Sequence, residues 1–161
     1  MLSGTRCDAT THTASRICYC CAYLQRPARL SGSLQLHSTK AVVQYGRYVI
    51  VILVAAACSL SLASGNLHGG AVALIFDICT STAITAISRD GFWDTGHVSR
   101  NLNCTYLRPA AEGTKVYVIS EVVHLGKRQG LTKGEIRLET EDGKIAYTCE
   151  HGKAAVGQSS L

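Results

Sequence analysis

Residues 66–83 read NLHGGAVALIFDICTSTA, and this stretch decides the fold. Apolar residues recur at spacings of three and four after the His-Gly-Gly triplet, which predicts a long helix over residues 70–88. The residues that set this period are Ala71, Leu74, Ile75, Ile78 and Ala83. One carboxylate, Asp77, interrupts the run, and a carboxylate is costly to bury without a partner. Asp77 therefore either faces water, bonded to Thr80 or Ser81 on the same helix face, or has a chemical function.

Four strand candidates follow this helix. They are residues 97–107, 114–125, 131–140 and 145–156. Residues 131–140 alternate most clearly, with Thr132, Gly134, Ile136 and Leu138 on one face, and residues 141–144 are a hairpin turn signal. One helix and an antiparallel meander bury the helix only if the sheet wraps around it, so the predicted class is α+β. A free sheet edge, or the other sheet face, then suits self-association.

The charge is divided unequally along the 161 residues. Residues 1–64 carry six basic residues and one acidic residue, whereas residues 65–161 carry ten of each. The net charge of +5 therefore belongs to the N-terminal part, and nothing predicts nucleic-acid binding by the remainder. The three cysteines after residue 65 are widely spaced, so they are interpreted as small buried apolar residues in a reducing compartment. They are Cys79, Cys104 and Cys149.

The N-terminal part differs from the rest. Residues 1–47 show no sustained helical or strand-like period, and the Cys18–Cys21 stretch lacks a second ligand pair, so no metal site is predicted. Their composition, rich in Arg and Ser and poor in acids, is typical of a mitochondrial transit peptide. Residues 48–63 form an apolar run shorter than the roughly 20 residues of a membrane-spanning helix. This run is a short anchor, a buried strand followed by a loop, or a segment that does not fold as written.

Three segments together resemble a known family: NLHGGAVALIFD, SRNLNCTYLRPA and GKIAYTCEHGK. They resemble the hotdog-fold acyl-CoA thioesterases, especially small eukaryotic thioesterase superfamily members related to bacterial phenylacetate-pathway thioesterases. The likeness covers roughly residues 65–155. It implies a long central helix wrapped by an antiparallel sheet, with active sites at a dimer interface.

The resemblance also implies roles for individual residues. The backbone N–H of Gly69 polarises the thioester carbonyl, which suits a helix N-terminus with free N–H groups. Asp77 of the partner subunit is the nucleophile or the general base that activates water. Ser99 orients that water or the acid, and His68 shapes the site. Outside this family context, Ser99 is equally an ordinary strand hydroxyl, and His68 is a capping residue.

Coenzyme A is expected only as part of the substrate, with no separate cofactor and no metal. The positions that match the family's coenzyme A contacts are Ser99, Asn101, Tyr106 and His124. Lys127, Arg128, His151 and Lys153 are further cations for the phosphates, because a polyanion needs cations near loop tips.

The likeness ends abruptly near Gly65. Leu62 stands where the family often has an asparagine, and residues 1–64 resemble neither the family's first helix nor its first strands. We interpret residues 1–64 as an atypical segment, either a targeting or anchor segment or a gene-model artefact, and residues 65–161 as the hotdog domain.

The expected function is hydrolysis of medium-chain, long-chain or aryl acyl-CoA thioesters by a dimer or a dimer of dimers. The alternative is a non-catalytic acyl-CoA-binding protein, inactivated by its N-terminus. A hotdog dehydratase ranks lower, because helix 70–88 holds no histidine. Membrane contact is expected only through residues 48–63, and the compartment is the cytosol or the mitochondrion.

Overall fold

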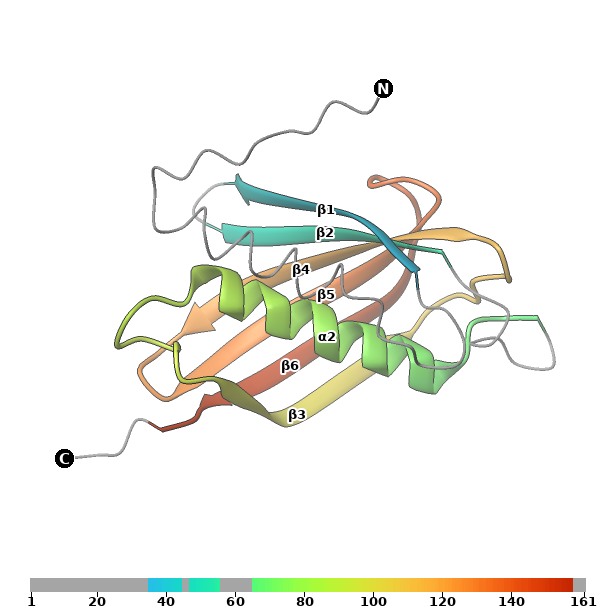
Figure 1. Ribbon diagram of the computed structural model, residues 1–161. Helices are drawn as coiled ribbons and strands as arrows, with labels where there is room; N and C mark the ends of the chain where they lie inside the picture. The colour runs from blue at the N-terminus through green and yellow to red at the C-terminus, as the bar shows by residue number, and fades with distance from the viewer. Residues whose placement is uncertain (1–34, 45–46, 56–64, 158–161) are drawn as a thin grey trace, which may run out of the picture.

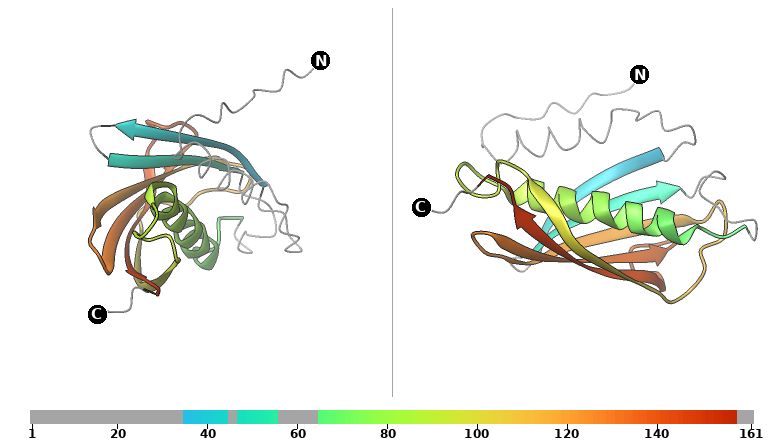
Figure 2. Two further views of the ribbon diagram at one scale, coloured as in Figure 1. Left: turned by 60° about the vertical axis from the view of Figure 1, so that its left-hand side comes forward. Right: turned by 90° about the horizontal axis from the view of Figure 1, so that it is seen from below.

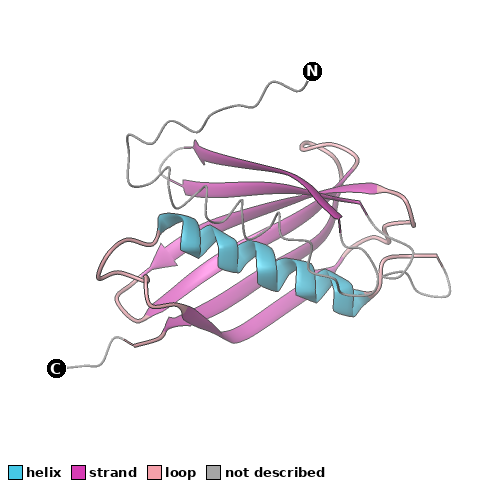
Figure 3. Ribbon diagram, in the orientation of Figure 1, coloured by secondary structure: helices cyan, strands magenta, loops and turns pink. Residues whose placement is uncertain are grey.

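The computed structural model describes residues 35–44, 47–55 and 65–157. Its described part has one long helix, α2 (Gly69–Ile87), on one face of an antiparallel sheet (Figures 1 and 3). The sheet has six strands in the order β1-β2-β4-β5-β6-β3. Their bounds are β1 Gln35–Gln44, β2 Arg47–Ala55, β3 His97–Tyr106, β4 Lys115–Leu125, β5 Gln129–Leu138 and β6 Ile145–Ala155. This is the α+β arrangement that the sequence predicts.

Helix α2 follows the predicted boundaries within one residue. His68 caps its start, where the Nδ1 atom accepts a hydrogen bond from the N–H of Gly70 at 2.9 Å. One side of the helix packs on the sheet through Ala71, Val72, Ile75, Phe76, Cys79, Thr80, Ala83 and Ile84, all buried. By length and composition α2 is apolar enough to cross a membrane, with a mean hydropathy of 1.8, but here it is the core helix of the sheet. Leu74 departs from the predicted core pattern, because it is 44% exposed.

Strands β3 to β6 confirm the four predicted strands. Each observed strand lies within two residues of its predicted bounds. In β5 the predicted alternation is present, because Gly130, Thr132, Gly134 and Ile136 are buried beneath the helix side of the sheet while Lys133 between them is exposed. The absence of a side chain at Gly134 makes room for the helix, since a Cβ there would lie 2.7 Å from a ring carbon of Phe76.

The N-terminal strands correct one expectation. Residues 35–44, for which no strand-like period was expected, form β1, and the apolar run contributes β2. Strand β2 pairs with β4 in register from Val49↔Glu121 to Ala55↔Lys115. Of the alternatives for residues 48–63, a strand is observed over residues 48–55, and residues 56–63 lie outside the described residues. Leu62 and Cys18–Cys21 lie outside the described residues.

The sheet curls around α2, so that strands on both sides of the helix approach it (Figure 2). Among the described strands, β3 forms one edge of the sheet and pairs only with β6. Every residue of β3 is exposed or partly exposed. This edge is where helix α2 and the end of β6 bring polar side chains together.

Candidate active site

Asp77 lies in the middle of α2, and its carboxylate meets the edge of the sheet. Its Oδ1 atom accepts a hydrogen bond from the hydroxyl of Ser99 on β3 at 2.9 Å. The Asp77 side chain is 45% exposed, so the carboxylate is held by the protein on one side and open on the other. The structure therefore brings together two of the residues expected in the site.

Lys153 on β6 approaches the same carboxylate oxygen. Its Nζ atom lies 3.3 Å from Oδ1 of Asp77, 2.9 Å from Oγ of Ser99 and 2.6 Å from Oγ of Ser81. The strand register explains the meeting, because Ser99 and Lys153 are direct partners across β3 and β6 and so share one face. The Lys153 side chain is only 3% exposed.

His151, two residues earlier on β6, completes the cluster. Its Nε2 atom lies 2.9 Å from Oγ of Ser99 and 3.6 Å from Oδ1 of Asp77. Its Nδ1 atom lies 2.7 Å from Oγ1 of Thr80 on the helix. The hydroxyl of Thr80 donates its single proton to the carbonyl oxygen of Phe76 at 2.6 Å. His151 thus connects Thr80 on the helix with Ser99, which donates to the carboxylate.

The surroundings favour a charged Asp77 and a neutral His151. Burial raises the pKa of the Asp77 carboxyl, but the Ser99 hydrogen bond and the positive charge of Lys153 outweigh it, so that pKa lies below its usual range. Burial and the Lys153 charge lower the pKa of His151 to about 4. Burial also lowers the pKa of Lys153, while its contact with Asp77 opposes that shift.

The start of α2 forms the second part of the site. His68 uses the N–H of Gly70, and among the described residues no acceptor contacts the N–H of Gly69. Tyr106 donates its hydroxyl proton to the carbonyl oxygen of Gly69 at 3.0 Å, and its ring stands edge-on to Tyr147. The free N–H of Gly69 at a helix N-terminus is suited to a developing negative charge.

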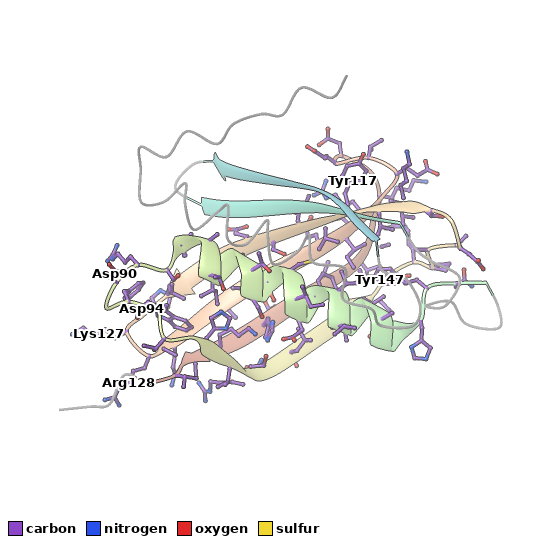
Figure 4. The ribbon with its side chains drawn as sticks, viewed as in Figure 1. Asp90, Asp94, Tyr117, Lys127, Arg128 and Tyr147 are labelled. Carbon is purple, nitrogen blue, oxygen red and sulfur yellow. The ribbon has the colours of Figure 1, made fainter. Side chains whose placement is uncertain are left out.

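The residues expected to contact coenzyme A lie in separate parts of the structure. Ser99 is in the carboxylate cluster, and Tyr106 is at the start of the helix. Asn101 lies over Gly152, so closely that a Cβ added at residue 152 would be 2.3 Å from Oδ1 of Asn101. His124, Lys127 and Arg128 line an open hollow of about 600 Å³ at the turn between β4 and β5. Figure 4 shows Lys127 and Arg128 projecting at that end of the sheet.

His151 and Lys153 are not at a loop tip, where phosphate-binding cations were expected. Both are buried inside the sheet and bonded to the Asp77 cluster. Their inward orientation follows from the strand period, because Tyr147, Cys149, His151 and Lys153 alternate along β6 and are all buried. Thr80 and Ser81 do not bond the Asp77 carboxylate themselves, but Thr80 contacts His151 and Ser81 contacts Lys153.

The thiols of the described part lie outside this chemistry. Cys79 and Cys149 are buried, Cys104 is partly buried, and all three are free. Burial raises the pKa of Cys79 and that of Cys149 to about 12, so both remain protonated. Within residues 65–157 no group of three or more His, Cys, Asp or Glu side chains is placed to hold a metal ion.

Comparison with known proteins identifies the family and the fold of this chain. Residues 64–145 match the family model described as the thioesterase superfamily, which is half of the chain, so the chain belongs to that superfamily. Solved structures share the hotdog fold. Mouse thioesterase superfamily member 2 is 20% identical with a TM-score of 0.60, covering 73% of this chain and 81% of that chain. The Escherichia coli PaaI protein of the phenylacetic acid degradation operon is 19% identical with a TM-score of 0.58, covering 74% and 80%. These likenesses confirm the predicted family and fold.

Two further relatives are similar to this chain. A Streptococcus pneumoniae hypothetical thioesterase solved with coenzyme A is 17% identical with a TM-score of 0.60, covering 80% of this chain and 89% of that chain. A Caenorhabditis elegans protein named "Putative esterase" is 30% identical over 87 residues, which are 54% of this chain and 48% of that protein. The chain thus matches about half the length of this curated relative.

Proposed function

We propose that the protein is an acyl-CoA thioesterase that releases a free acid and coenzyme A. The observation that carries the proposal is the Asp77 carboxylate, which is held by Ser99 and Lys153 on one oxygen and is open to solvent on its other side. An ionised carboxylate in such a place either takes a proton from water or attacks a carbonyl carbon itself. Membership of the thioesterase superfamily supports this reaction class.

The proposed reaction needs a group that stabilises the thioester oxygen as negative charge develops on it. The unused N–H of Gly69 is suited to this role. With Asp77 as base, water loses a proton to the carboxylate and adds to the carbonyl carbon, the C–S bond breaks, and the thiolate takes up a proton. With Asp77 as nucleophile, an acyl anhydride forms as the thiolate leaves, and water then hydrolyses it.

The spacing of these two groups supports a site shared between subunits. Asp77 is eight residues after Gly69 on one helix, which is about 12 Å at 1.5 Å per residue. Groups that act on one carbonyl must lie within about 3 Å of it. We therefore propose that Gly69 of one protomer works with Asp77 of the partner subunit.

The edge strand supports the same assembly. Strand β3 carries apolar residues that are exposed in the single chain, Val98 at 54% and Tyr106 at 53%, with Leu107 just beyond its end. An edge strand with exposed apolar side chains is a surface on which a second copy pairs. We propose a dimer joined along β3, with a dimer of dimers as the larger form.

For coenzyme A we propose the surface between the carboxylate cluster and the β4–β5 turn. His124, Lys127 and Arg128 line a hollow there, and Gly130 on its wall is the register partner of Lys153. Cations at such a turn suit the phosphates. Support comes from the Streptococcus pneumoniae structure of the same fold, which holds coenzyme A. Medium-chain, long-chain and aryl acyl groups are the proposed substrates.

The test is release of free coenzyme A from a panel of these acyl-CoA thioesters, followed by chromatography because eight protein cysteines interfere with a thiol dye. Turnover of at least one thioester supports the proposal. A folded, dimeric protein that binds acyl-CoA without releasing coenzyme A would overturn it in favour of a binding protein.

A further inference from the structure

We propose that Lys153 is a positioning residue, which holds Asp77 and Ser99 in the geometry of the reaction and is not itself a substrate contact. The inference rests on the proposed thioesterase function. It concerns a side chain that lies behind the carboxylate, on the side away from solvent.

The first argument is the number of protons on the ammonium group. A lysine ammonium has three N–H donors. In this structure Asp77, Ser81 and Ser99 each receive one of them. With its side chain 3% exposed and every donor in use, Lys153 is unavailable to a phosphate of coenzyme A.

The second argument is the oxygen on which the contacts converge. Ser99, Lys153 and the more distant His151 all approach Oδ1 of Asp77. Among the described residues none makes a hydrogen bond or an ion pair to Oδ2. Lys153 also donates to Ser99, so the hydroxyl that bonds Asp77 is itself fixed. The arrangement leaves Oδ2 as the oxygen that meets water or the thioester carbon.

The third argument is electrostatic. The titratable groups near Asp77 are Lys153 and His151 on β6 and His97 on β3. The inward residues of β4 and β5 beneath the helix are not titratable; they include Val116, Val118, Ser120, Gly130 and Thr132. Because His151 has a pKa of about 4, Lys153 is the cation of this cluster at neutral pH. Its removal raises the pKa of Asp77.

The experiment compares three variants of the full chain with the wild type. Lys153→Met removes the charge and keeps an apolar stem of similar length, while Lys153→Arg keeps the charge in a planar group with a different donor geometry. Lys133→Met on β5 is the matched control, since that exposed lysine pairs with Glu150 at 3.6 Å on the surface, away from Asp77. For each variant, kcat and KM for one acyl-CoA are measured across pH.

We expect Lys153→Met to lower kcat about tenfold or more with KM within about twofold, as for a lost positioning group. The acid limb of its kcat profile moves up by about one pH unit. Lys153→Arg keeps the acid limb at the wild-type pH with a smaller loss of kcat. Lys133→Met matches the wild type throughout.

A folded Lys153→Met protein with a wild-type acid limb would overturn the proposal, and so would a change confined to KM, which would assign Lys153 to substrate binding. If Lys153→Met fails to fold, carbon-13 NMR titration of the Asp77 carboxyl is done in the wild type and in Lys153→Arg. A pKa below the usual aspartate range in both supports the inference, and an ordinary value in the wild type contradicts it. A wild type that releases no coenzyme A while NMR finds that low pKa would refute the proposed function alone.

Discussion

The hydroxyl of Ser99 lies 2.9 Å from Oδ1 of Asp77, although 22 residues separate them in sequence. The edge position of β3 produces this contact, because the strand passes alongside α2 and pairs with β6 at Ser99↔Lys153. The carboxylate, the hydroxyl and the ammonium therefore come from three different elements. Their geometry depends on the sheet register, so variants that disturb the register are expected to disturb the site.

Tyr106 holds the start of the helix through its hydroxyl. In Tyr106→Phe the bond to the Gly69 carbonyl is lost, while the ring remains against Tyr147. We expect the free energy of unfolding to fall by about 0.5–1.5 kcal/mol, measured by urea denaturation. Tyr117→Phe on β4 is the control, since its hydroxyl has no hydrogen bond within the described part. Equal losses in the two variants would show that the Tyr106 contact adds nothing.

The free energy of unfolding is expected to decrease as the pH is lowered through the range where histidines titrate. The folded protein keeps His151 neutral, with a pKa lowered to about 4 by burial and the Lys153 charge, whereas the unfolded chain binds a proton near pH 6.5. The unfolded state thus holds more protons between these values, and the stability present above about pH 6.5 is lost progressively down to about pH 4. His97, whose pKa is also lowered by burial, adds to the same slope.

The measurement is urea unfolding at a series of pH values from 7 to 4. The slope is expected to be shallower in His151→Gln and unchanged in His124→Gln, a histidine exposed at the end of β4. A slope that is the same in all three proteins would contradict the neutral, buried state of His151.

Self-association is expected to depend on the free edge of β3. Val98→Glu places a charge on that edge, at a side chain that is 54% exposed in the single chain. We expect a folded monomer with at least tenfold lower activity, because the proposed site needs two subunits. Sedimentation analysis gives the mass, and circular dichroism checks the fold.

Val123→Glu on β4 is the matched control, since that valine is 45% exposed but lies on a strand paired on both sides. If Val123→Glu is a monomer and Val98→Glu remains a dimer, the interface lies on the sheet face and not on the β3 edge.

The sequence predicted most of the residues of the fold from Gly65 onward, because local patterns specify them. The 3.6-residue period located α2, and alternation located β5. The N-terminal strands were harder, since the apolar run that contains β2 does not alternate, and periodicity alone cannot distinguish such a run from a helix. Leu74 fits the helical period but is exposed, because the strands cover only part of the helix surface.

The site was predictable only in part. The family motif indicated Gly69, Asp77 and Ser99. In the structure the Ser99 hydroxyl donates a hydrogen bond to the Asp77 carboxylate. The positions of His151 and Lys153 beside Asp77 depend on the pairing of β6 with β3, a non-local register that the sequence does not encode in any single segment. Their charges suggested phosphate binding, whereas their burial ties them to the carboxylate.

The central claim is that the Asp77 carboxylate performs thioester hydrolysis. The direct measurement is coenzyme A release by the wild type and by Asp77→Asn, which keeps the shape of the side chain and removes its charge. Asp142→Asn, in the exposed turn before β6, is the control. We predict a loss of about 100-fold or more in kcat for Asp77→Asn, with an unchanged fold and an unaffected control. Wild-type turnover by a folded Asp77→Asn protein would contradict the account.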